Sequence, residues 1–340
     1  MTTLNNSKIG LVLTGGGAKG AYQIGVLKYL AEINFEPEII TATSIGALHG
    51  AILCSYSSLK EGVNHLEQIW NQLEDIELIK PNHNAVIKTL SYGVKTISPH
   101  FTEWTMNLLE NLGIIKNHNS IFDPEPLENL VRENIDFDKI FNSNKELWVK
   151  VFPAWKIPGI DYDLILNLID LFRAKTGVKS EWLKLQDCQD IDTIYNLLLA
   201  SAAIPLAFPQ KSVNGKFYSD GSLDGEIPIK PLIDRGCTHI IIVHLSNGVK
   251  FDRSNYPQQT IIEIRPEEII NSFNTVILGD LNSLFDFSST RIKMLKNRGY
   301  QDAKKSLENI IKAINIKSEQ QISENYLINS TKQLLNDLPL

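Results

Sequence analysis

The sequence predicts a three-layer α/β/α fold in which helices cover both faces of a mostly parallel sheet. The first 60 residues alternate strand and helix patterns, and short apolar strands return after residue 210. Such alternation favours a parallel sheet, because each helix carries the chain back across the sheet to the next strand. The 340 residues include 43% hydrophobic side chains, enough to build one large core.

Two strand–helix units open the chain. Lys8–Thr14 is short, apolar and rich in β-branched residues, as expected of a buried strand, and Ala21–Ile33 places apolar residues at helical spacing. Glu38–Thr43 predicts a second strand, and Ile45–Tyr56 predicts a helix rich in small residues. The parallel sheet therefore begins with two strands, each followed by a helix.

Helices are expected to dominate residues 60–195. Val63–Ile79 is amphipathic, and Asp123–Leu127 combines an N-cap with prolines suited to the first turn of a helix. Gly159–Lys175 is a strongly apolar helical stretch, whereas Glu146–Phe152 is expected to add a strand to the sheet.

Strand patterns return late in the sequence. Gly215–Ser219, His239–Leu245 and Thr260–Ile264 are short segments typical of strands. The last ~75 residues predict helices, and the chain contains no internal repeat or low-complexity linker. These features favour one elaborated domain.

Composition and charge restrict the classes of partner. The formal net charge is −6, whereas domains that bind nucleic acid are usually basic, so no nucleic-acid partner is expected. Cys54, Cys188 and Cys237 are far apart, which predicts neither a disulfide framework nor a metal site. No signal-peptide pattern is present, and no apolar run approaches the ~18 residues of a membrane-spanning helix. We therefore expect a cytoplasmic protein without metal or cofactor, and contact with a membrane surface remains open.

A glycine-rich turn, Thr14–Gly20, joins the first strand to the first helix. Its glycines allow positive φ and close approach of the backbone, and the helix behind it presents free N–H groups, so the turn suits a phosphate or a developing oxyanion. The turn matches G-x-G-x-x-G, but the dinucleotide fingerprint requires an acidic residue at the end of the second strand, where this chain has a serine. A Walker A motif is excluded because Lys19 is followed by glycine. A tight turn without a ligand is the other alternative.

Ser44 follows the second strand within Ala42-Thr43-Ser44-Ile45-Gly46. The pentapeptide resembles a nucleophile elbow, although Ala42 replaces the first glycine of the usual G-x-S-x-G. A plain N-cap for the next helix is the alternative. Because neighbouring parallel strands end at one edge of a sheet, the Ser44 hydroxyl and the N–H groups of the glycine turn are expected to converge on one carbonyl, as acyl transfer requires.

A serine nucleophile needs a base, and the sequence offers aspartate and histidine. Asp220, in a turn after a short strand, is the better candidate, because partial burial raises the pKa of a carboxylate and makes it a stronger base. His49 lies about 140° around its helix from Ser44 and is not expected to face the hydroxyl. His244 keeps a Ser–Asp–His order open, and Asp224 repeats the Asp-Gly pattern, so residue chemistry alone does not decide.

Together the motifs resemble those of the patatin-like phospholipase family. That family has a G-G-G-x-[RK]-G loop, a G-x-S-x-G elbow and a D-G-G or D-G-A turn. The corresponding segments here are Gly15–Gly20, Ala42–Gly46 and Asp220–Ser222. Ala200–Pro209, before the aspartate, and Glu226–Ile229, after it, are also similar to the family. All of these blocks occur in the family's order, which is more specific than any one of them.

The resemblance implies a Ser–Asp dyad in which Ser44 is the nucleophile and Asp220, rather than Asp224, is the base. The implied oxyanion donors are the backbone N–H groups of Gly15, Gly16, Gly17 and Ala18, and the supporting motif positions are Lys19, Gly20, Gly46 and Gly221. The implied reaction releases a fatty acid from a phospholipid or related lipid ester through an acyl-enzyme, as in a lipase or phospholipase A, without metal or cofactor. Ala42 and Ser222 depart from the family pattern, but both are small.

The resemblance also implies a patatin-like catalytic domain over residues 8–250, with helical insertions at about 60–120 and 155–190. Residues 251–340 would form a mostly helical extension packed on it. Ile160–Phe172, within the second insertion, is expected to be a lid, a membrane-facing helix or a cover for the core.

A lipid hydrolase meets its substrate at a membrane or micelle surface, and a regulatory partner is compatible with the sequence. The basic stretch Arg291–Lys317 is expected either to meet anionic head groups or to form a solvated helix face. Two other functions stay open. One is a non-catalytic lipid- or nucleotide-binding module of the same fold, and the other is a soluble esterase or thioesterase whose Ser–Asp–His triad uses His244.

Overall fold

The computed structural model describes residues 8–73, 125–155, 170, 177–204, 208–248, 251–268, 270, 284 and 286–336. The strands in these ranges are β1 (Ile9–Leu13), β2 (Ile39–Ala42), β3 (Glu146–Pro153), β4 (Glu181–Lys184), β5 (Lys211–Val213), β6 (Lys216–Asp220), β7 (His239–Val243) and β8 (Thr260–Ile264). They form one sheet in the order β5-β6-β3-β2-β1-β7-β8, and β4 pairs with β3.

The sheet is mostly parallel, as predicted. β1 pairs in parallel with β2 and β7, β2 pairs with β3, and β7 pairs with β8. β3 pairs antiparallel with β4 and β6, and β6 pairs antiparallel with β5. The sequence interpretation missed β4 and β5. These strands have four and three residues and no run of buried side chains, so they leave little pattern to detect.

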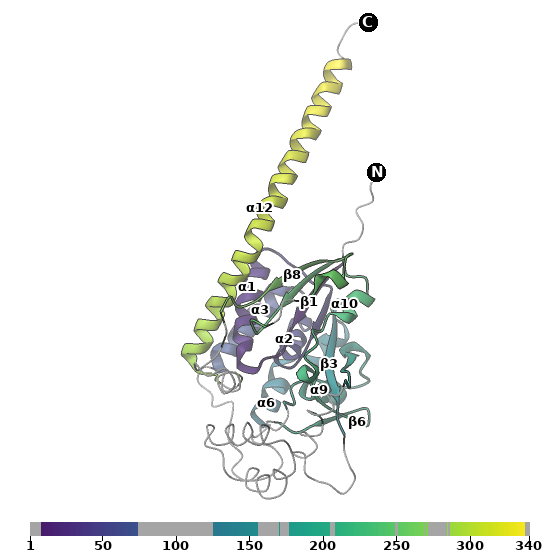
Figure 1. The fold of residues 1–340 in the computed structure, drawn as a ribbon, viewed down its shortest axis with the longest axis vertical. Helices are drawn as coiled ribbons and strands as arrows, with labels where there is room; N and C mark the ends of the chain where they lie inside the picture. Colours follow the sequence, from purple (N-terminus) through teal and green to yellow (C-terminus); the bar gives the residue numbers. More distant parts are fainter. Residues whose placement is uncertain are drawn as a thin grey trace, which may run out of the picture.

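Helices cover both faces of the sheet. The α-helices are α1 (Gly20–Glu32), α2 (Ile45–Cys54), α3 (Leu59–Leu73), α6 (Glu125–Asn134), α7 (Phe137–Phe141), α9 (Ile191–Ser201), α10 (Lys230–Asp234) and α12 (Ser289–Asn336). The 3-10 helices are η1 (Gly17–Lys19), η3 (Leu185–Asp187), η4 (Gly221–Asp224) and η5 (Arg253–Asn255). Buried side chains of α1, α2, α3, α9 and α12 form one core against the sheet, and α10 covers the other face (Figure 1).

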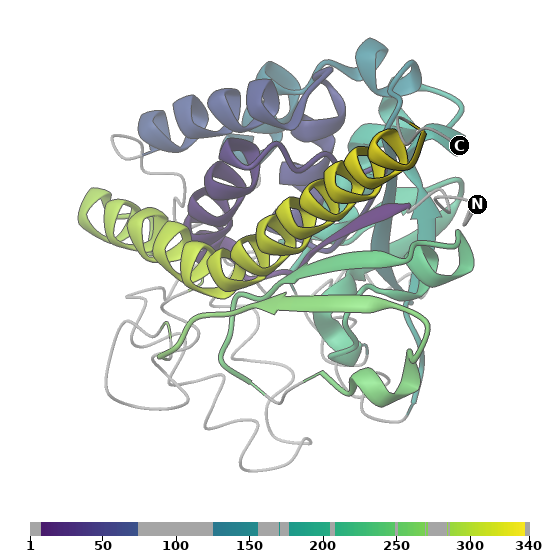
Figure 2. The same cartoon turned by 90° about the horizontal axis from the view of Figure 1, so that it is seen from above.

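Alternate residues of β1 reach the two cores. Leu11 and Leu13 belong to the larger core, whereas Val12 packs with Leu232 and Ile240 on the opposite face. A strand that is buried on both faces is typical of the centre of an α/β sheet. The layered arrangement seen from above in Figure 2 confirms the three-layer α/β/α fold class.

Most predicted elements are present near their expected bounds. α3 begins earlier than expected, at Leu59, and residues 74–79 of the predicted helix lie outside the described residues. The apolar helix predicted over residues 159–175 also lies outside them, apart from Asp170. The helices expected near the C-terminus are mainly one helix, α12, of 48 residues.

α12 crosses α1 at close range (Figure 2). A Cβ on Gly25 of α1 would lie 1.8 Å from the carbonyl oxygen of Lys296, and one on Gly299 of α12 would lie 2.0 Å from the carbonyl oxygen of Tyr22. Glycine on both helices therefore allows the two backbones to approach. Beyond this crossing, the C-terminal half of α12 extends clear of the sheet and its helices (Figure 1).

The length and apolar character of the described helices bear on whether any of them could cross a membrane. None of them combines the length with the apolar character that crossing a bilayer requires. Several basic residues of α12 pair with acidic side chains. Arg298 lies 3.8 Å from Asp302, and Lys312 lies 3.2 Å from Glu308. This pairing favours the solvated-face interpretation of the helix.

Candidate active site

The two turns that were expected to converge lie at one edge of the sheet. Leu13, at the end of β1, pairs in register with Ala42, at the end of β2. The glycine turn and Ser44 therefore follow neighbouring strand ends. A Cβ on Gly15 would lie 3.0 Å from the Cβ of Ser44, so the glycine turn packs directly against the serine.

Ser44 occupies the sharp turn between β2 and α2. Its φ of 55° and ψ of −129° are unusual for a residue with a side chain, and its side chain makes no capping hydrogen bond to α2. Ser44 is the N-cap residue of α2 by position, but its hydroxyl does not cap the helix. A strained strand-to-helix turn is the geometry of a nucleophile elbow. Gly46 allows the turn, because a Cβ there would lie 2.4 Å from the carbonyl oxygen of Leu13.

The two departures from the usual motifs fit their surroundings. The methyl group of Ala42 is fully buried in the larger core. The Ser222 hydroxyl lies 2.6 Å from where a Cβ on Gly15 would be, so it contacts the glycine turn that faces Ser44. Neither side chain disrupts the local geometry.

The glycine turn presents backbone donors beside Ser44. Gly17 has a φ of 53°, a conformation that glycine adopts without strain. Among the described residues, no acceptor is hydrogen-bonded to the N–H groups of Gly15, Gly16 or Gly17. The turn continues through η1 into α1, which adds the positive end of a helix dipole. Such donors are suited to an anion or a developing oxyanion.

Asp220 comes from the end of β6, on the antiparallel side of β3. It pairs in register with Val151 of β3, and its backbone N–H donates to the carbonyl of Ala203 at 3.0 Å. Its carboxylate accepts a hydrogen bond from the Ser222 N–H at 2.7 Å. The Ser44 hydroxyl lies close enough to this carboxylate to act on the pKa of Asp220 and lower it. The structure therefore brings Ser44 and Asp220 together from elements that are far apart in the sequence.

Burial raises the pKa of the Asp220 carboxyl above its ordinary value. Hydrogen bonds from Ser222 and Ser44 and the positive charge of Lys150 act in the opposite direction, but burial outweighs them. A carboxylate whose pKa is raised is a better proton acceptor than one in water. Asp220 is therefore more basic than an exposed aspartate, and it lies beside Ser44.

A second aspartate in the same turn is engaged elsewhere. The Asp224 carboxylate lies 2.5 Å from the ammonium of Lys150 and accepts a hydrogen bond from the Ser180 N–H at 2.9 Å. Burial acts to raise its pKa, but the bonds from Lys150 and Ser180 outweigh burial and lower it. Of the two Asp-Gly turns, only the one at Asp220 therefore contacts the serine.

Ser201 is a site residue that motif reasoning missed. It is fully buried at the end of α9, where its Oγ accepts the Ser44 N–H at 2.9 Å and donates to the Lys150 carbonyl at 2.8 Å. No residue pattern distinguishes this serine from others. The only available signal is its location in the segment Ala200–Pro209, which resembles the family.

The comparison with protein families agrees with this geometry. The model of the family described as "Patatin-like phospholipase" matches residues 11–233, more than half of the chain and all three motifs. The chain belongs to this family. The resemblance stated from the motifs is therefore confirmed.

Individual relatives of this patatin-like chain are much longer proteins. The neuropathy target esterase sws of Drosophila melanogaster is 50% identical over 253 residues, which are 74% of this chain and 14% of that protein. The sws protein of Drosophila erecta is 50% identical over 52 residues, 15% of this chain and 4% of that protein. The chain thus spans a small part of the length of the curated relatives it matches.

Solved structures similar to this patatin-like chain are distant in sequence. VipD from Legionella pneumophila is 14% identical with a TM-score of 0.42, over 89% of this chain and 67% of that chain. ExoU of Pseudomonas aeruginosa, in a complex with SpcU, is 16% identical with a TM-score of 0.38, over 88% of this chain and 53% of that chain. The strand order, rather than these distant likenesses, establishes the fold of this patatin-like chain.

The two buried histidines near the sheet edge are held by other groups. His49 has both ring nitrogens engaged, Nδ1 with Gln23 at 2.8 Å and Nε2 with the indole N–H of Trp70 at 3.0 Å. Burial lowers the pKa of His49 to about 3. His49 is therefore a structural residue of this patatin-like core.

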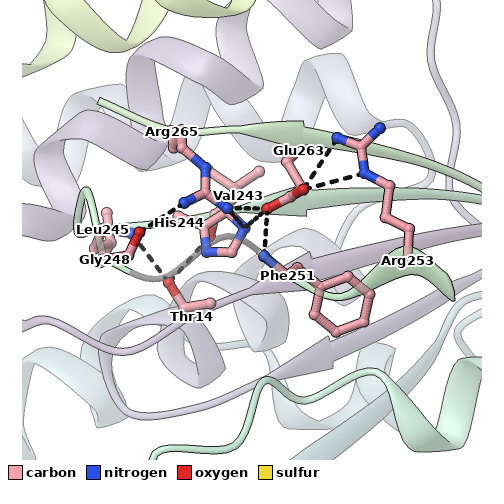
Figure 3. Close-up of polar contacts among 9 residues, drawn as sticks. All are labelled: Thr14, Val243, His244, Leu245, Gly248, Phe251, Arg253, Glu263 and Arg265. Atoms are coloured by element: carbon pink, nitrogen blue, oxygen red, sulfur yellow. Dashed lines mark hydrogen bonds and ion pairs between the residues drawn. The ribbon is translucent and has the colours of Figure 1, made fainter. Parts of the chain in front are cut away.

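His244, the base of the rival triad, belongs to a network at the end of β7 and β8 (Figure 3). Its Nε2 lies 3.1 Å from Glu263 and 3.3 Å from the guanidinium of Arg265. Burial and the charge of Arg265 lower the pKa of His244 to about 4. The same network includes Thr14, whose hydroxyl accepts the Leu245 N–H at 3.1 Å and so braces the start of the glycine turn. No contact between His244 and Ser44 or Asp220 is present among the described residues.

The remaining motif positions support the turn. A Cβ on Gly20 would lie 2.7 Å from Ile45, and one on Gly221 would lie 2.3 Å from the Lys150 carbonyl, so both positions need glycine. Lys19 is 5% exposed, and its N–H donates to the Gly16 carbonyl at 3.1 Å.

Within the described ranges, no group of three or more His, Cys, Asp or Glu side chains is arranged to hold a metal ion.

Proposed function

We propose that this chain is a serine lipid acyl hydrolase in which Ser44 is the nucleophile and Asp220 is its base. One observation carries the proposal. A hydroxyl on a strained strand–helix turn lies beside a buried carboxylate whose pKa it helps to lower, next to backbone N–H groups that have no acceptor in the described part of the chain. Nucleophile, base and oxyanion donors are the three components that acyl transfer needs in one place.

The reaction follows from these positions. Asp220 accepts the hydroxyl proton as Ser44 attacks the ester carbonyl, and the N–H groups of Gly15, Gly16, Gly17 and Ala18 stabilise the oxyanion. Asp220 then protonates the departing alcohol, which leaves an acyl group on Ser44. Water, deprotonated by the same carboxylate, attacks the acyl-enzyme. Asp220 returns that proton to the Ser44 oxygen as the bond to the acyl group breaks and the fatty acid leaves.

The substrate class is the second part of the proposal. Family membership and the esterase name of the relatives support a phospholipid or a related lipid ester at a membrane or micelle surface. We place the protein in the cytoplasm, in peripheral contact with membranes. A regulatory partner would set when that contact occurs.

Two rival functions make different demands on the site. A Ser–Asp–His triad would require His244 to reach the serine, whereas its Nε2 is occupied by Glu263 and Arg265. A lipid- or nucleotide-binding module would not need a serine held at a φ of 55°, which is costly for a residue with a side chain.

The test is fatty-acid release from phospholipid vesicles by the full chain and four variants. Ser44→Ala and Asp220→Asn remove the nucleophile and the base, and each should lower kcat by about 10³-fold or more. His244→Asn should retain activity within about tenfold. Ser55→Ala is the matched control, because this buried serine at the far end of α2 donates to the Ala51 carbonyl and does not contact the site.

Labelling by a fluorophosphonate probe provides a second measurement that does not depend on the lipid chosen. The wild type and Ser55→Ala should be labelled at Ser44, and Ser44→Ala should not be labelled. Full activity in Ser44→Ala would overturn the mechanism. Loss of activity in a folded His244→Asn would favour the triad, and absence of both labelling and hydrolysis would favour the binding module.

A further inference from the structure

Lys150 places a buried positive charge beside the candidate site. Its side chain is fully buried in the middle of β3, where the ammonium lies 2.5 Å from the Asp224 carboxylate and donates to the Glu226 carbonyl at 2.5 Å. The ammonium also lies 5.4 Å from the centre of the Trp182 ring. Taking an ammonium out of water is unfavourable, and a buried ion pair often stabilises a fold no more than apolar residues would. The pair therefore calls for an explanation other than stability.

The backbone of Lys150 is linked to Ser44. Its carbonyl accepts the Ser201 hydroxyl at 2.8 Å, and the same Ser201 oxygen accepts the Ser44 N–H at 2.9 Å. One buried hydrogen-bond chain therefore runs from β3 to the strained turn. Since Ser44 has an unusual backbone conformation, an acceptor fixed on a rigid strand helps to hold it there.

The same residue is linked to Asp220. Asp220 pairs with Val151, the next residue of β3, and Gly221 packs so closely on Lys150 that a Cβ would lie 2.3 Å from its carbonyl oxygen. The Lys150 ammonium forms an ion pair with Asp224, the last residue of the 3-10 helix η4 that follows Asp220. Backbone and side chain thus hold the two ends of one turn.

We propose that Lys150 is a positioning residue that holds Ser44 and Asp220 in one arrangement, through Ser201 on one side and through Asp224 on the other. Its buried ammonium also stabilises the ionised form of Asp220. The inference rests on the proposed function, because it assigns Lys150 to the reaction that Ser44 and Asp220 would perform. A lysine in the middle of a buried strand is the sequence feature it explains.

The charged groups around Asp220 set the expected sign of the pH effect. Lys150 faces it from β3, and Asp224 of η4 pairs with the Lys150 ammonium. The Glu226 carboxylate pairs with Lys179 and acts on the Lys150 ammonium through its charge. Ser44 and Ser222 contribute neutral hydrogen bonds. Lys150 opposes the upward shift that burial imposes on the pKa of Asp220. Removing the ammonium should therefore raise this pKa further, and a base that works ionised then loses activity at acidic pH.

The pH profile of kcat/KM for a soluble ester separates charge from structure. Lys150→Met should move the acid limb to higher pH and lower kcat/KM at neutral pH about tenfold or more. Lys150→Arg keeps the positive charge, so the acid limb of its pH profile should lie at the same pH as in the wild type. Ser201→Ala cuts the link to Ser44, so it should lower kcat with the limb unmoved.

A paired variant guards against loss of folding. Lys150→Met leaves Asp224 buried without its partner, which destabilises the protein, whereas Lys150→Met with Asp224→Asn leaves a neutral pair. The double variant should recover much of the stability in urea unfolding and keep the acid limb at the higher pH. A limb that returns to the wild-type position in the double variant would overturn the electrostatic part of the proposal.

Titration of the Asp220 carboxyl by ¹³C NMR tests the inference without catalysis. In the full chain with Ser44→Ala, adding Lys150→Met should move the Asp220 titration to higher pH, and adding Lys150→Arg should not. If the Asp220 carboxyl titrates at the same pH with and without Lys150→Met, the inference is contradicted even if the enzyme is active. A moved titration in a protein that hydrolyses no ester would instead count against the proposed function alone.

Discussion

Ser44 and Asp220 are both held in states that oppose folding. The φ of 55° at Ser44 costs about 1–3 kcal/mol, and it persists because its N–H is bonded to Ser201 and Gly46 packs on the Leu13 carbonyl. Asp220 is buried, and its pKa is raised by that burial. Strain and a desolvated carboxylate in contact are typical of a site selected for chemistry rather than stability.

Asp220→Asn should make the protein more resistant to unfolding at neutral pH. A carboxyl whose pKa is raised on folding stabilises the fold fully below its unfolded pKa and loses that contribution as pH rises through its folded pKa. Asparagine mimics the neutral form and keeps an oxygen for the Ser222 N–H. Urea unfolding at neutral pH should show a higher midpoint for the variant, and a lower midpoint would contradict the prediction.

The control for this experiment is Asp224→Asn, in the same turn. The pKa of Asp224 is lowered, because its bonds with Lys150 and Ser180 outweigh burial, so its charge stabilises the fold at neutral pH. Removing that charge leaves the Lys150 ammonium buried without its carboxylate, which typically costs about 3–5 kcal/mol. If Asp220→Asn stabilises the protein and Asp224→Asn destabilises it, the effect of burying a carboxylate is distinguished from the effect of its ion pair.

At the scale of elements, β3 and the crossing of α1 with α12 organise the molecule. β3 is parallel to β2 and antiparallel to β6, so one strand joins the Ser44 side of the sheet to the Asp220 side. α1, which follows the glycine turn, is held from behind by α12 through Gly25 and Gly299. The C-terminal helix therefore supports the helix whose N-terminal end faces the site.

Gly25→Ala should destabilise the protein strongly, because its Cβ would lie 1.8 Å from the Lys296 carbonyl and neither helix backbone can yield without separating. The free energy of unfolding, measured with urea, should fall by about 1–3 kcal/mol or more. Gly50→Ala is the control, since the nearest atom to its Cβ is the Leu147 Cδ1 at 2.8 Å, the movable end of a side chain. Equal losses in the two variants would show that the helix crossing is not the cause.

At the scale of the whole molecule, two buried histidines of the described residues, His49 and His244, contribute to the response to acid. The pKa values of His49 and His244 are lowered to about 3 and about 4, chiefly by burial, from an ordinary value of 6.5. A base held neutral in the fold contributes full stability above its unfolded pKa. That contribution is lost as pH falls below that value toward the folded pKa, because the unfolded chain binds the proton first.

We therefore expect the urea midpoint to fall as pH is lowered from about 6.5 to about 4. His244→Asn should make this fall shallower, because it removes one of these two buried histidines of the described residues. His239→Asn, which changes an exposed histidine at the start of the same strand, is the control and should follow the wild type. If the urea midpoint of His244→Asn falls with pH as steeply as that of the wild type, the prediction is contradicted.

The division of the chain into a catalytic domain over residues 8–250 and an extension over 251–340 remains a prediction. β8 lies beyond residue 250 and pairs with β7 in the same sheet. Ile264 of β8 and Leu295 of α12 belong to the core that also contains Leu13. The part of the extension that the structure describes is therefore continuous with the packing around the site.

The parts of the site predicted from sequence are those with local patterns. The glycine turn, the elbow at Ser44 and the turn at Asp220 each follow a strand within a few residues, so composition and spacing identify them. β4 and β5 were missed because short, half-buried strands have no periodic pattern. For Lys150 the sequence predicts only that it lies in a strand, because nothing in a single sequence distinguishes a buried lysine from an exposed one.

The sequence by itself determined the fold class, the family and the candidate pair, because strand–helix alternation and turn motifs are properties of short segments. The tertiary structure decided which groups meet. Ser44 contacts Ser201 across 157 residues, and Lys150 contacts Asp224 across 74. It also showed His244 engaged with Glu263 and Arg265 rather than with the serine. Contacts of this kind depend on how the strands are ordered in the sheet, and that order arises only when the whole chain packs.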